Sequence, residues 1–217
     1  MTGLDVLETR LGLYRLLSAL YRYPVSAEVL EALADSKVAE DSPLSQALRA
    51  LQHAISGMDA TLEDRLNIEM TRLMEGPGLT PAPPYASYYL HGGQLMGPAA
   101  QAARRAYLEW QVIPKQGSIP PDHLSLELGF LAVLTEKAMM DDEVQQLAAL
   151  HASHTFLREQ VRPWLSRFCA DLESNSREAF FTALARLTLL VTQADDEWLE
   201  GFLMESNSIK MANFAHS

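Results

Sequence analysis

LDVLETRLGLYRLLSALYRYP, residues 4–24, has a clear helical period near the start of this 217-residue chain. Its apolar side chains recur at steps of three or four residues, at Leu4, Leu7, Leu11, Tyr14, Leu17 and Tyr21. That spacing places them on one face of an α-helix, which ends before Pro24. The same period continues along most of the chain, and no stretch sustains the alternation of a β-strand. The sequence therefore predicts an all-α protein.

Helix start signals divide the rest of the chain. Ser26 and Ser42-Pro43 are typical N-terminal caps, Asp59 opens another helix, and Pro98 suits a first turn. The acidic triplets 141–143 and 195–197 are expected at helix starts, where carboxylates complement the helix dipole. The expected helices cover about residues 4–23, 26–34, 42–55, 59–74, 98–111, 122–138, 142–156, 161–172, 176–192 and 194–204. Segment 85–93 suits either a short helix or an extended piece, so we expect one globular bundle of about ten helices.

Composition limits the classes of partner. At 48% hydrophobic residues the chain can bury a sizeable core. Its net charge of −11, from 28 acidic and 17 basic residues, argues against nucleic acid and an anionic membrane surface and suits a cationic partner. The lone Cys169 is interpreted as a buried small hydrophobe in a protein of a reducing compartment. No signal peptide or transmembrane segment is recognisable, so we expect a cytoplasmic protein.

Two proline-rich breaks interrupt the helical pattern. The first, EGPGLTPAPP, covers residues 75–84, and the second, IPKQGSIPP, covers residues 113–121. Proline disfavours helix in both. The second break predicts a hinge loop (113–122), stiffened by Pro120 and Pro121, between an N-terminal helical half (1–112) and a C-terminal helical half (123–217). Such a hinge could let the halves exchange between copies, so a monomer and a domain-swapped dimer both stay open.

Asp122, His123 and Glu127 follow the second break. Asp122 is expected to be the N-cap of the helix that follows, and His123 and Glu127 share one face of that helix. The same residue types could form a metal or acid–base site, with His151 or His154 as a further ligand. Adjacent helix residues point in different directions, so the three side chains rarely converge. The capping interpretation is therefore favoured, and no catalytic or metal residue is assigned.

Residues 73–96 combine apolar and aromatic side chains with rigid prolines and one acidic residue, Glu75. Methionine and tyrosine beside prolines make an adaptable apolar surface of the kind that binds peptides. The same composition also suits core lining under a loop. The large apolar members are Leu73, Met74, Leu79, Tyr85, Tyr88, Tyr89, Leu90, Leu95 and Met96. No phosphate loop, dinucleotide motif or common hydrolase motif occurs, so no cofactor is expected.

The central motifs together resemble the TorD/DmsD family of molybdoenzyme-specific chaperones. One is RLMEGPGLTPAPPYASYYLHGGQLMG, residues 72–97, and the other is PPDHLSLELGFLAVL, residues 120–134. The terminal stretches LGLYRLLSALYRYP, PWLSRF and FFTALARLTLL are also similar to family helices, so the resemblance covers nearly the whole chain. The family's hinge motif begins with Glu or Gln where this chain has Ile119, and Tyr85 and Tyr89 stand where tryptophan is frequent.

The resemblance implies a non-enzymatic cytoplasmic role. Such a chaperone binds the twin-arginine signal peptide of a molybdopterin-containing oxidoreductase, holds the precursor during cofactor insertion and proofreads export, with at most transient membrane or translocase contact. Mapped onto this chain, the peptide-binding residues are Leu73, Met74, Pro84, Tyr85, Tyr89, Asp122 and His123. Asp122 is the first choice to pair with a leader arginine, with Glu127 and Glu75 behind it, and His123 would orient Asp122 or gate the hinge by protonation.

Two alternatives are kept beside this one. A chaperone of the related NarJ type would serve a molybdoenzyme that is not exported. A metal-dependent hydrolase would use Asp122 and His123, with His151 or His154 as a further ligand. Stoichiometric metal in protein purified without a chelator would favour the hydrolase.

Overall fold

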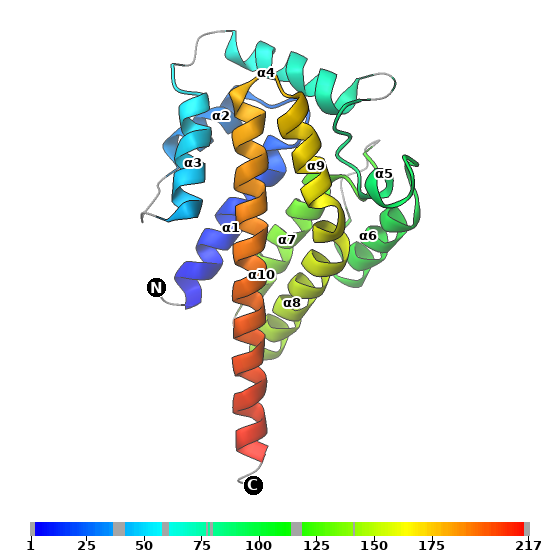
Figure 1. Ribbon diagram of the computed structural model, residues 1–217. Helices are drawn as coiled ribbons and strands as arrows, with labels where there is room; N and C mark the ends of the chain where they lie inside the picture. The colour runs from blue at the N-terminus through cyan, green and yellow to red at the C-terminus, as the bar shows by residue number, and fades with distance from the viewer. Residues whose placement is uncertain are drawn as a thin grey trace.

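The computed structural model describes residues 3–36, 42–57, 61–76, 78, 80–113, 119–140 and 142–214. Within these ranges the chain forms α-helices and two short π-helices and no β-strand, which confirms the all-α class (Figure 1). The helices of the first half are α1 (Gly3–Leu20), α2 (Ala27–Asp35), α3 (Pro43–Ala54), α4 (Leu62–Met70), η1 (Thr71–Glu75), α5 (Ala86–Leu90) and α6 (Pro98–Glu109). Those of the second half are α7 (Leu124–Ala138), α8 (Glu143–Phe156), η2 (Leu157–Val161), α9 (Arg162–Asn175) and α10 (Ala179–Phe214).

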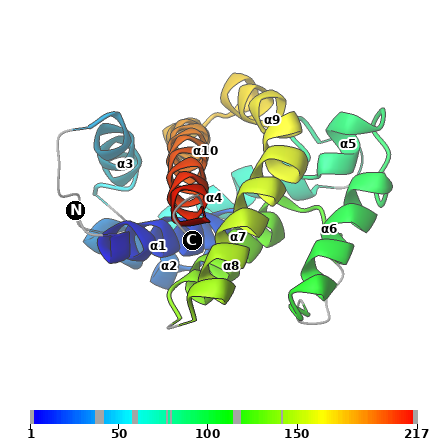
Figure 2. The ribbon, with the colours of Figure 1, turned by 90° about the horizontal axis from the view of Figure 1, so that it is seen from below.

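Helices from the two predicted halves share one hydrophobic core. The long helix α10 lies between α3 and α9, and α1 packs along α7 (Figure 2). The buried apolar cluster is continuous from Leu7 to Leu203 and includes Cys169, which is fully buried as predicted. The division at residues 113–122 stays a prediction, and its segment 114–118 lies outside the described residues.

Local start signals match most helix ends. The Ser26 hydroxyl accepts a hydrogen bond from the Val29 amide, and Ser42 forms a reciprocal capping box with Ser45. Pro98 occupies the first turn of α6. Asp59 and Asp141 lie outside the described residues, whereas Asp142 caps α8 through the amides of the first turn. The undecided segment 85–93 contains the short helix α5.

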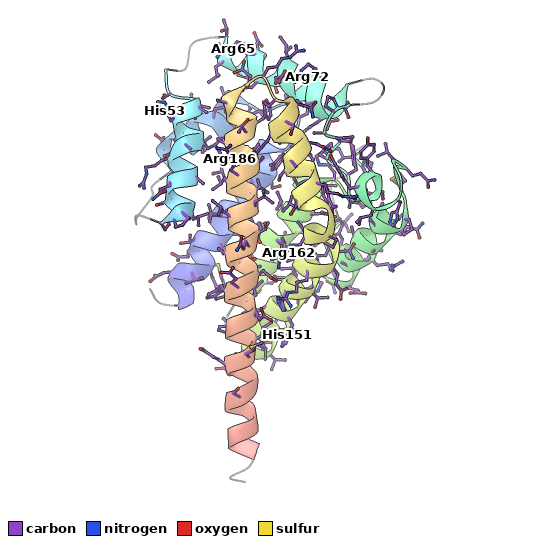
Figure 3. All side chains as sticks on the ribbon, in the orientation of Figure 1. His53, Arg65, Arg72, His151, Arg162 and Arg186 are labelled. Atoms are coloured by element: carbon purple, nitrogen blue, oxygen red, sulfur yellow. The ribbon has the colours of Figure 1, made fainter. Side chains whose placement is uncertain are left out.

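The expected helix start at residues 195–197 is wrong. Helix α10 continues for 36 residues through this point, so Asp195 and Asp196 lie in mid-helix and do not complement a helix dipole. Both carboxylates are buried, at 7% and 4% exposure. Arginines from other helices balance their charge. One of these is Arg162, at the start of α9 (Figure 3).

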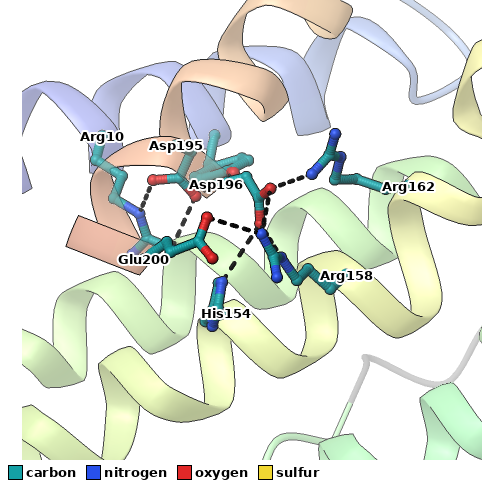
Figure 4. A network of polar contacts seen from close by, with 8 residues as sticks. Arg10, His154, Arg158, Arg162, Asp195, Asp196 and Glu200 are labelled. Carbon is teal, nitrogen blue, oxygen red and sulfur yellow. Dashed lines mark hydrogen bonds and ion pairs between the residues drawn. The ribbon is translucent and has the colours of Figure 1, made fainter. Parts of the chain in front are cut away.

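Two ion clusters therefore tie α10 to its neighbours (Figure 4). Arg10 of α1 contacts Asp195 at 2.5 Å, and the Tyr14 hydroxyl donates to the same carboxylate at 2.6 Å. Arg158 of η2 contacts Asp196 at 2.8 Å and Glu200 at 3.0 Å. Burial alone would raise the pKa of Asp196, but its contacts with Arg158 and Arg162 hold that pKa below its usual value. Desolvation of the two charges offsets much of the attraction in a buried pair of this kind.

Two π-turns depart from the regular helical period. The turn η1 extends α4 by Thr71–Glu75, and η2 connects α8 to α9 without a loop. Each π-turn shifts the following side chains around the helix axis, and such turns often occur at functional sites. Within the described residues, no helix is both long and apolar enough to span a membrane.

Candidate functional site

The two proline-rich motifs meet in space. Tyr85 and His123 form an isolated antiparallel bridge. The Ala86 amide donates to the Asp122 carbonyl at 3.0 Å, and the Leu124 amide donates to the Pro84 carbonyl at 2.9 Å. We call residues 82–87 and 120–125 the junction. Backbone pairing at the junction holds the start of α5 against the start of α7.

Asp122 is not the N-cap of the helix that follows it, contrary to the sequence-based expectation. Its carboxylate Oδ2 accepts a hydrogen bond from the Ser87 amide at 2.7 Å, in the first turn of α5. The residue is fully buried, at 0% exposure. Asp122 therefore caps a different helix from the one it precedes, and that contact joins residues 35 positions apart.

His123 occupies the N-cap position of α7. Its Nδ1 accepts a hydrogen bond from the Ser125 amide at 3.1 Å. A backbone amide can only donate, so this contact requires an unprotonated Nδ1 and leaves the proton on Nε2. Nε2 lies 3.3 Å from a carboxylate oxygen of Glu75, to which it donates. The edge-on Tyr85 ring, with centroids 5.1 Å apart, completes the surroundings of the imidazole.

Glu127 lies one helical turn further along α7, in the core. It is fully buried, and within the described residues neither carboxylate oxygen has a hydrogen-bond partner. Burial, and then the nearby Asp122, raise the pKa of Glu127 well above its usual value. Because these effects disfavour the charged form, Glu127 is unsuited to an ion pair with a bound arginine.

The predicted apolar site residues lie together but are mostly covered. Leu73, Met74 and Pro84 are buried, and the Leu73 carbonyl accepts from the Ala82 amide at 2.9 Å. Tyr89 is 9% exposed and stacks on Trp164 at 5.6 Å. These side chains support the junction from beneath.

The accessible groups at the junction are few. Tyr85 is half-buried, and burial, Glu75 and Asp122 raise the pKa of its hydroxyl to about 12, so that it stays protonated. Tyr88 is half-buried and packs edge-on against Tyr89 at 5.2 Å. The Glu75 side chain is 28% exposed, more than that of Asp122 or Glu127, so a peptide could reach its carboxylate.

A further apolar groove of 760 Å³ lies beside the hinge, between α1, α6 and α7. The hinge prolines Pro120 and Pro121 form part of its wall, together with Ile119. The Tyr107 hydroxyl donates to the Pro121 carbonyl at 2.7 Å and so fixes α6 to the hinge. Sequence reasoning missed this groove. One signal was available in the sequence. Arg104 and Leu108 are four residues apart, so a charged and an apolar side chain share one face of α6.

The metal-site alternative gains no support from the part of the chain that the structure describes. No group of three His, Cys, Asp or Glu side chains there is placed to hold one ion. His151 is exposed on α8 (Figure 3), and His154 lies 3.5 Å from the Asp196 carboxylate. Neither histidine joins Asp122 and His123.

Comparison with known proteins agrees with the geometry. The family model described as nitrate reductase delta subunit matches residues 38–170. The chaperone protein TorD of Vibrio cholerae is 31% identical over 188 residues, which are 84% of each chain. TorD of Shewanella oneidensis is 27% identical over 218 residues, covering 92% of this chain and 94% of the relative.

A solved structure supports the same relationship. The crystal structure of an Archaeoglobus fulgidus protein, described as a redox enzyme maturation protein, superimposes with a TM-score of 0.55 at 25% identity. The match covers 83% of this chain and 93% of the archaeal one. The sequence relatives are described as chaperones and this neighbour as a redox enzyme maturation protein, and none of them is described as an enzyme. The chain therefore belongs to the TorD/DmsD family of chaperones.

Proposed function

We propose that this protein is a cytoplasmic chaperone that binds the twin-arginine leader, or the apo form, of a molybdoenzyme, and that it supports cofactor insertion and export proofreading. The observation that carries the proposal is the junction: the two family motifs meet there and present one accessible carboxylate beside partly exposed tyrosines.

Glu75 is the residue we assign to the leader arginine. A guanidinium pairs best with a carboxylate that can receive two parallel hydrogen bonds. Asp122 is fully buried and its Oδ2 is committed to the Ser87 amide, while burial disfavours the charged form of Glu127. The Glu75 side chain is 28% exposed, and at the junction it contacts His123.

His123 and Asp122 then serve as positioning residues. His123 donates from Nε2 to Glu75 at 3.3 Å and so fixes the orientation of that carboxylate. Asp122 holds the start of α5, which carries Tyr88 and Tyr89, by its bond to the Ser87 amide. A leader arginine at Glu75 would share the carboxylate with Nε2 of His123.

The apolar stretch of the leader is expected to pack on the tyrosines of the junction. Tyr85 and Tyr88 are half-buried and offer ring faces with polar hydroxyls, while Leu73, Met74 and Pro84 fill the space beneath them. An amphipathic helix on such a surface buries its apolar face and keeps its polar side in water. The net charge of −11 speeds the encounter with a basic leader more than it tightens the complex.

Calorimetric titration tests this proposal. The purified protein is titrated with the leader peptide of a molybdoenzyme encoded beside its gene, and with the same peptide after Arg-Arg→Lys-Lys substitution. We expect saturable heat with the native leader and weaker binding with the lysine peptide, because lysine cannot form the two-bond contact. The absence of heat with either peptide at tens of micromolar would reject leader binding.

A second candidate is a chaperone of the NarJ type, whose client is not exported. It is favoured by the family model described as nitrate reductase delta subunit, which matches residues 38–170. The two candidates differ in the client's N-terminus: an exported client carries the twin-arginine motif. Pull-down of the neighbouring molybdoenzyme with and without its N-terminal segment separates them.

A further inference from the structure

The apolar groove beside the hinge is not used by the proposed leader site. Its described wall consists of Ser18 and Arg22 near the end of α1, Met96, Arg104, Tyr107, Leu108, Val112 and Ile113 around α6, Ile119, Pro120 and Pro121 of the hinge, and Ser125, Leu126, Gly129, Phe130 and Val133 of α7. None of the residues assigned to leader binding belongs to this wall. The groove and the leader site therefore use different side chains, although Pro120, Pro121 and Ser125 belong both to the groove wall and to the junction.

Large apolar side chains around the groove remain exposed. Met96, Leu108 and Ile113 are 59%, 57% and 79% exposed. The groove volume of 760 Å³ is within the range of ligand and peptide sites. Exposed apolar side chains that continue into a cavity of this size are typical of a protein interaction surface.

The charge of the groove is opposite to that of the whole protein. Both charged residues of its described wall are arginines, Arg22 and Arg104, and both are exposed. No acidic side chain contributes to the described wall, although the protein carries a net charge of −11. Within the described residues neither guanidinium takes part in a hydrogen bond or ion pair. Such a site repels a cationic leader and attracts an apolar segment that carries carboxylates.

We propose that this groove binds an acidic amphipathic helix of the client enzyme, at a position distinct from the leader. The client's identity as a molybdoenzyme rests on the proposed function. The apolar side chains of the partner helix pack in the groove between Leu108 and Phe130. Its carboxylates pair with Arg22 and Arg104. Binding at two sites separated by the hinge raises the overall affinity for a precursor above that for either segment alone.

Two synthetic probe peptides test the groove. Both are fluorescein-labelled amphipathic helices with identical leucine positions; one carries glutamates on its polar face and the other lysines. Fluorescence anisotropy in low salt measures their affinities for the full chain. We expect the acidic probe to bind at least about tenfold more tightly, equivalent to about 1.4 kcal/mol.

Charge reversal then locates the site. The double variant Arg22→Glu with Arg104→Glu should reverse the preference, so that the lysine probe binds more tightly. Arg105→Glu is the matched control, because Arg105 is exposed on the same helix but lies outside the groove wall. Leu108→Ser should weaken both probes, because it removes apolar surface and leaves the arginines in place. Circular dichroism checks that each variant keeps its helices.

Equal affinity for the two probes, or an unchanged preference in the double reversal, would overturn the groove proposal. The native leader is titrated in parallel with every variant. If the leader binds but the protein does not distinguish the two probes, only the groove proposal is rejected. If the protein distinguishes the probes but does not bind the leader, the proposed leader function is rejected and the groove proposal stands.

Discussion

The buried carboxyl group of Glu127 predicts a specific dependence of stability on pH. Both of its oxygens are buried without a hydrogen-bond partner among the described residues, and burial followed by Asp122 raises its pKa well above the usual 4.5. Between the usual and the raised pKa, the folded protein holds one proton more than the unfolded chain. Stability therefore falls as pH rises through this window, by at most ~1.4 kcal/mol per pH unit for this one group.

Glu127→Gln removes this dependence, because the amide stays neutral at every pH. Urea unfolding followed by circular dichroism, between about pH 5 and about pH 8, gives the free energy of unfolding of both proteins. We expect the free energy of unfolding of the variant to increase steadily relative to that of the wild type as pH rises. Glu136→Gln is the matched control, since Glu136 is 60% exposed in its pair with Arg15. A difference between variant and wild type that is constant across this range would refute the argument.

Other predictions concern buried polar groups and the thiol. Asp195→Ala should lower the free energy of unfolding, measured by urea unfolding, by about 3–5 kcal/mol, because it leaves the buried Arg10 without its carboxylate partner. Replacing both Arg10 and Asp195 by apolar residues should recover most of that stability. Asp122→Ala should cost about 1–3 kcal/mol by the same assay, since the buried Ser87 amide loses its acceptor, while the helical circular dichroism persists. Burial raises the pKa of the Cys169 thiol, so it should react with Ellman's reagent after unfolding in urea but not in the native protein.

Local sequence predicted the helices well where local contacts define them. The caps at Ser26 and Ser42 use atoms within three residues, so a short window contains the information. The error at residues 195–197 has a different cause. A run of acidic residues resembles the first turn of a helix, but Asp195 and Asp196 pair with arginines at least 34 residues away, which no local pattern shows.

The candidate site shows the same limit. The sequence predicted a helix start near Asp122 and His123, but it assigned the cap of α7 to Asp122 instead of His123. The Asp122 carboxylate is turned toward Ser87, 35 residues away, because the two motifs pair through their backbones. Burial of Leu73 and Met74, and the exposure of Glu75 beside them, depend on the π-turn η1, whose period differs from that of the predicted helix.

The central claim, that Glu75 receives an arginine of a twin-arginine leader, is tested most directly by a double-mutant cycle. Calorimetry measures the wild type and Glu75→Gln against the native leader and against leaders with either arginine replaced by glutamine. Asp64→Asn, which removes an exposed charge on α4, controls for net charge. The account predicts a coupling free energy of about 1.5–3 kcal/mol between Glu75 and one of the two arginines, and almost none for Asp64. Additive effects of the Glu75 and arginine changes, or an equal coupling to Asp64, would contradict it.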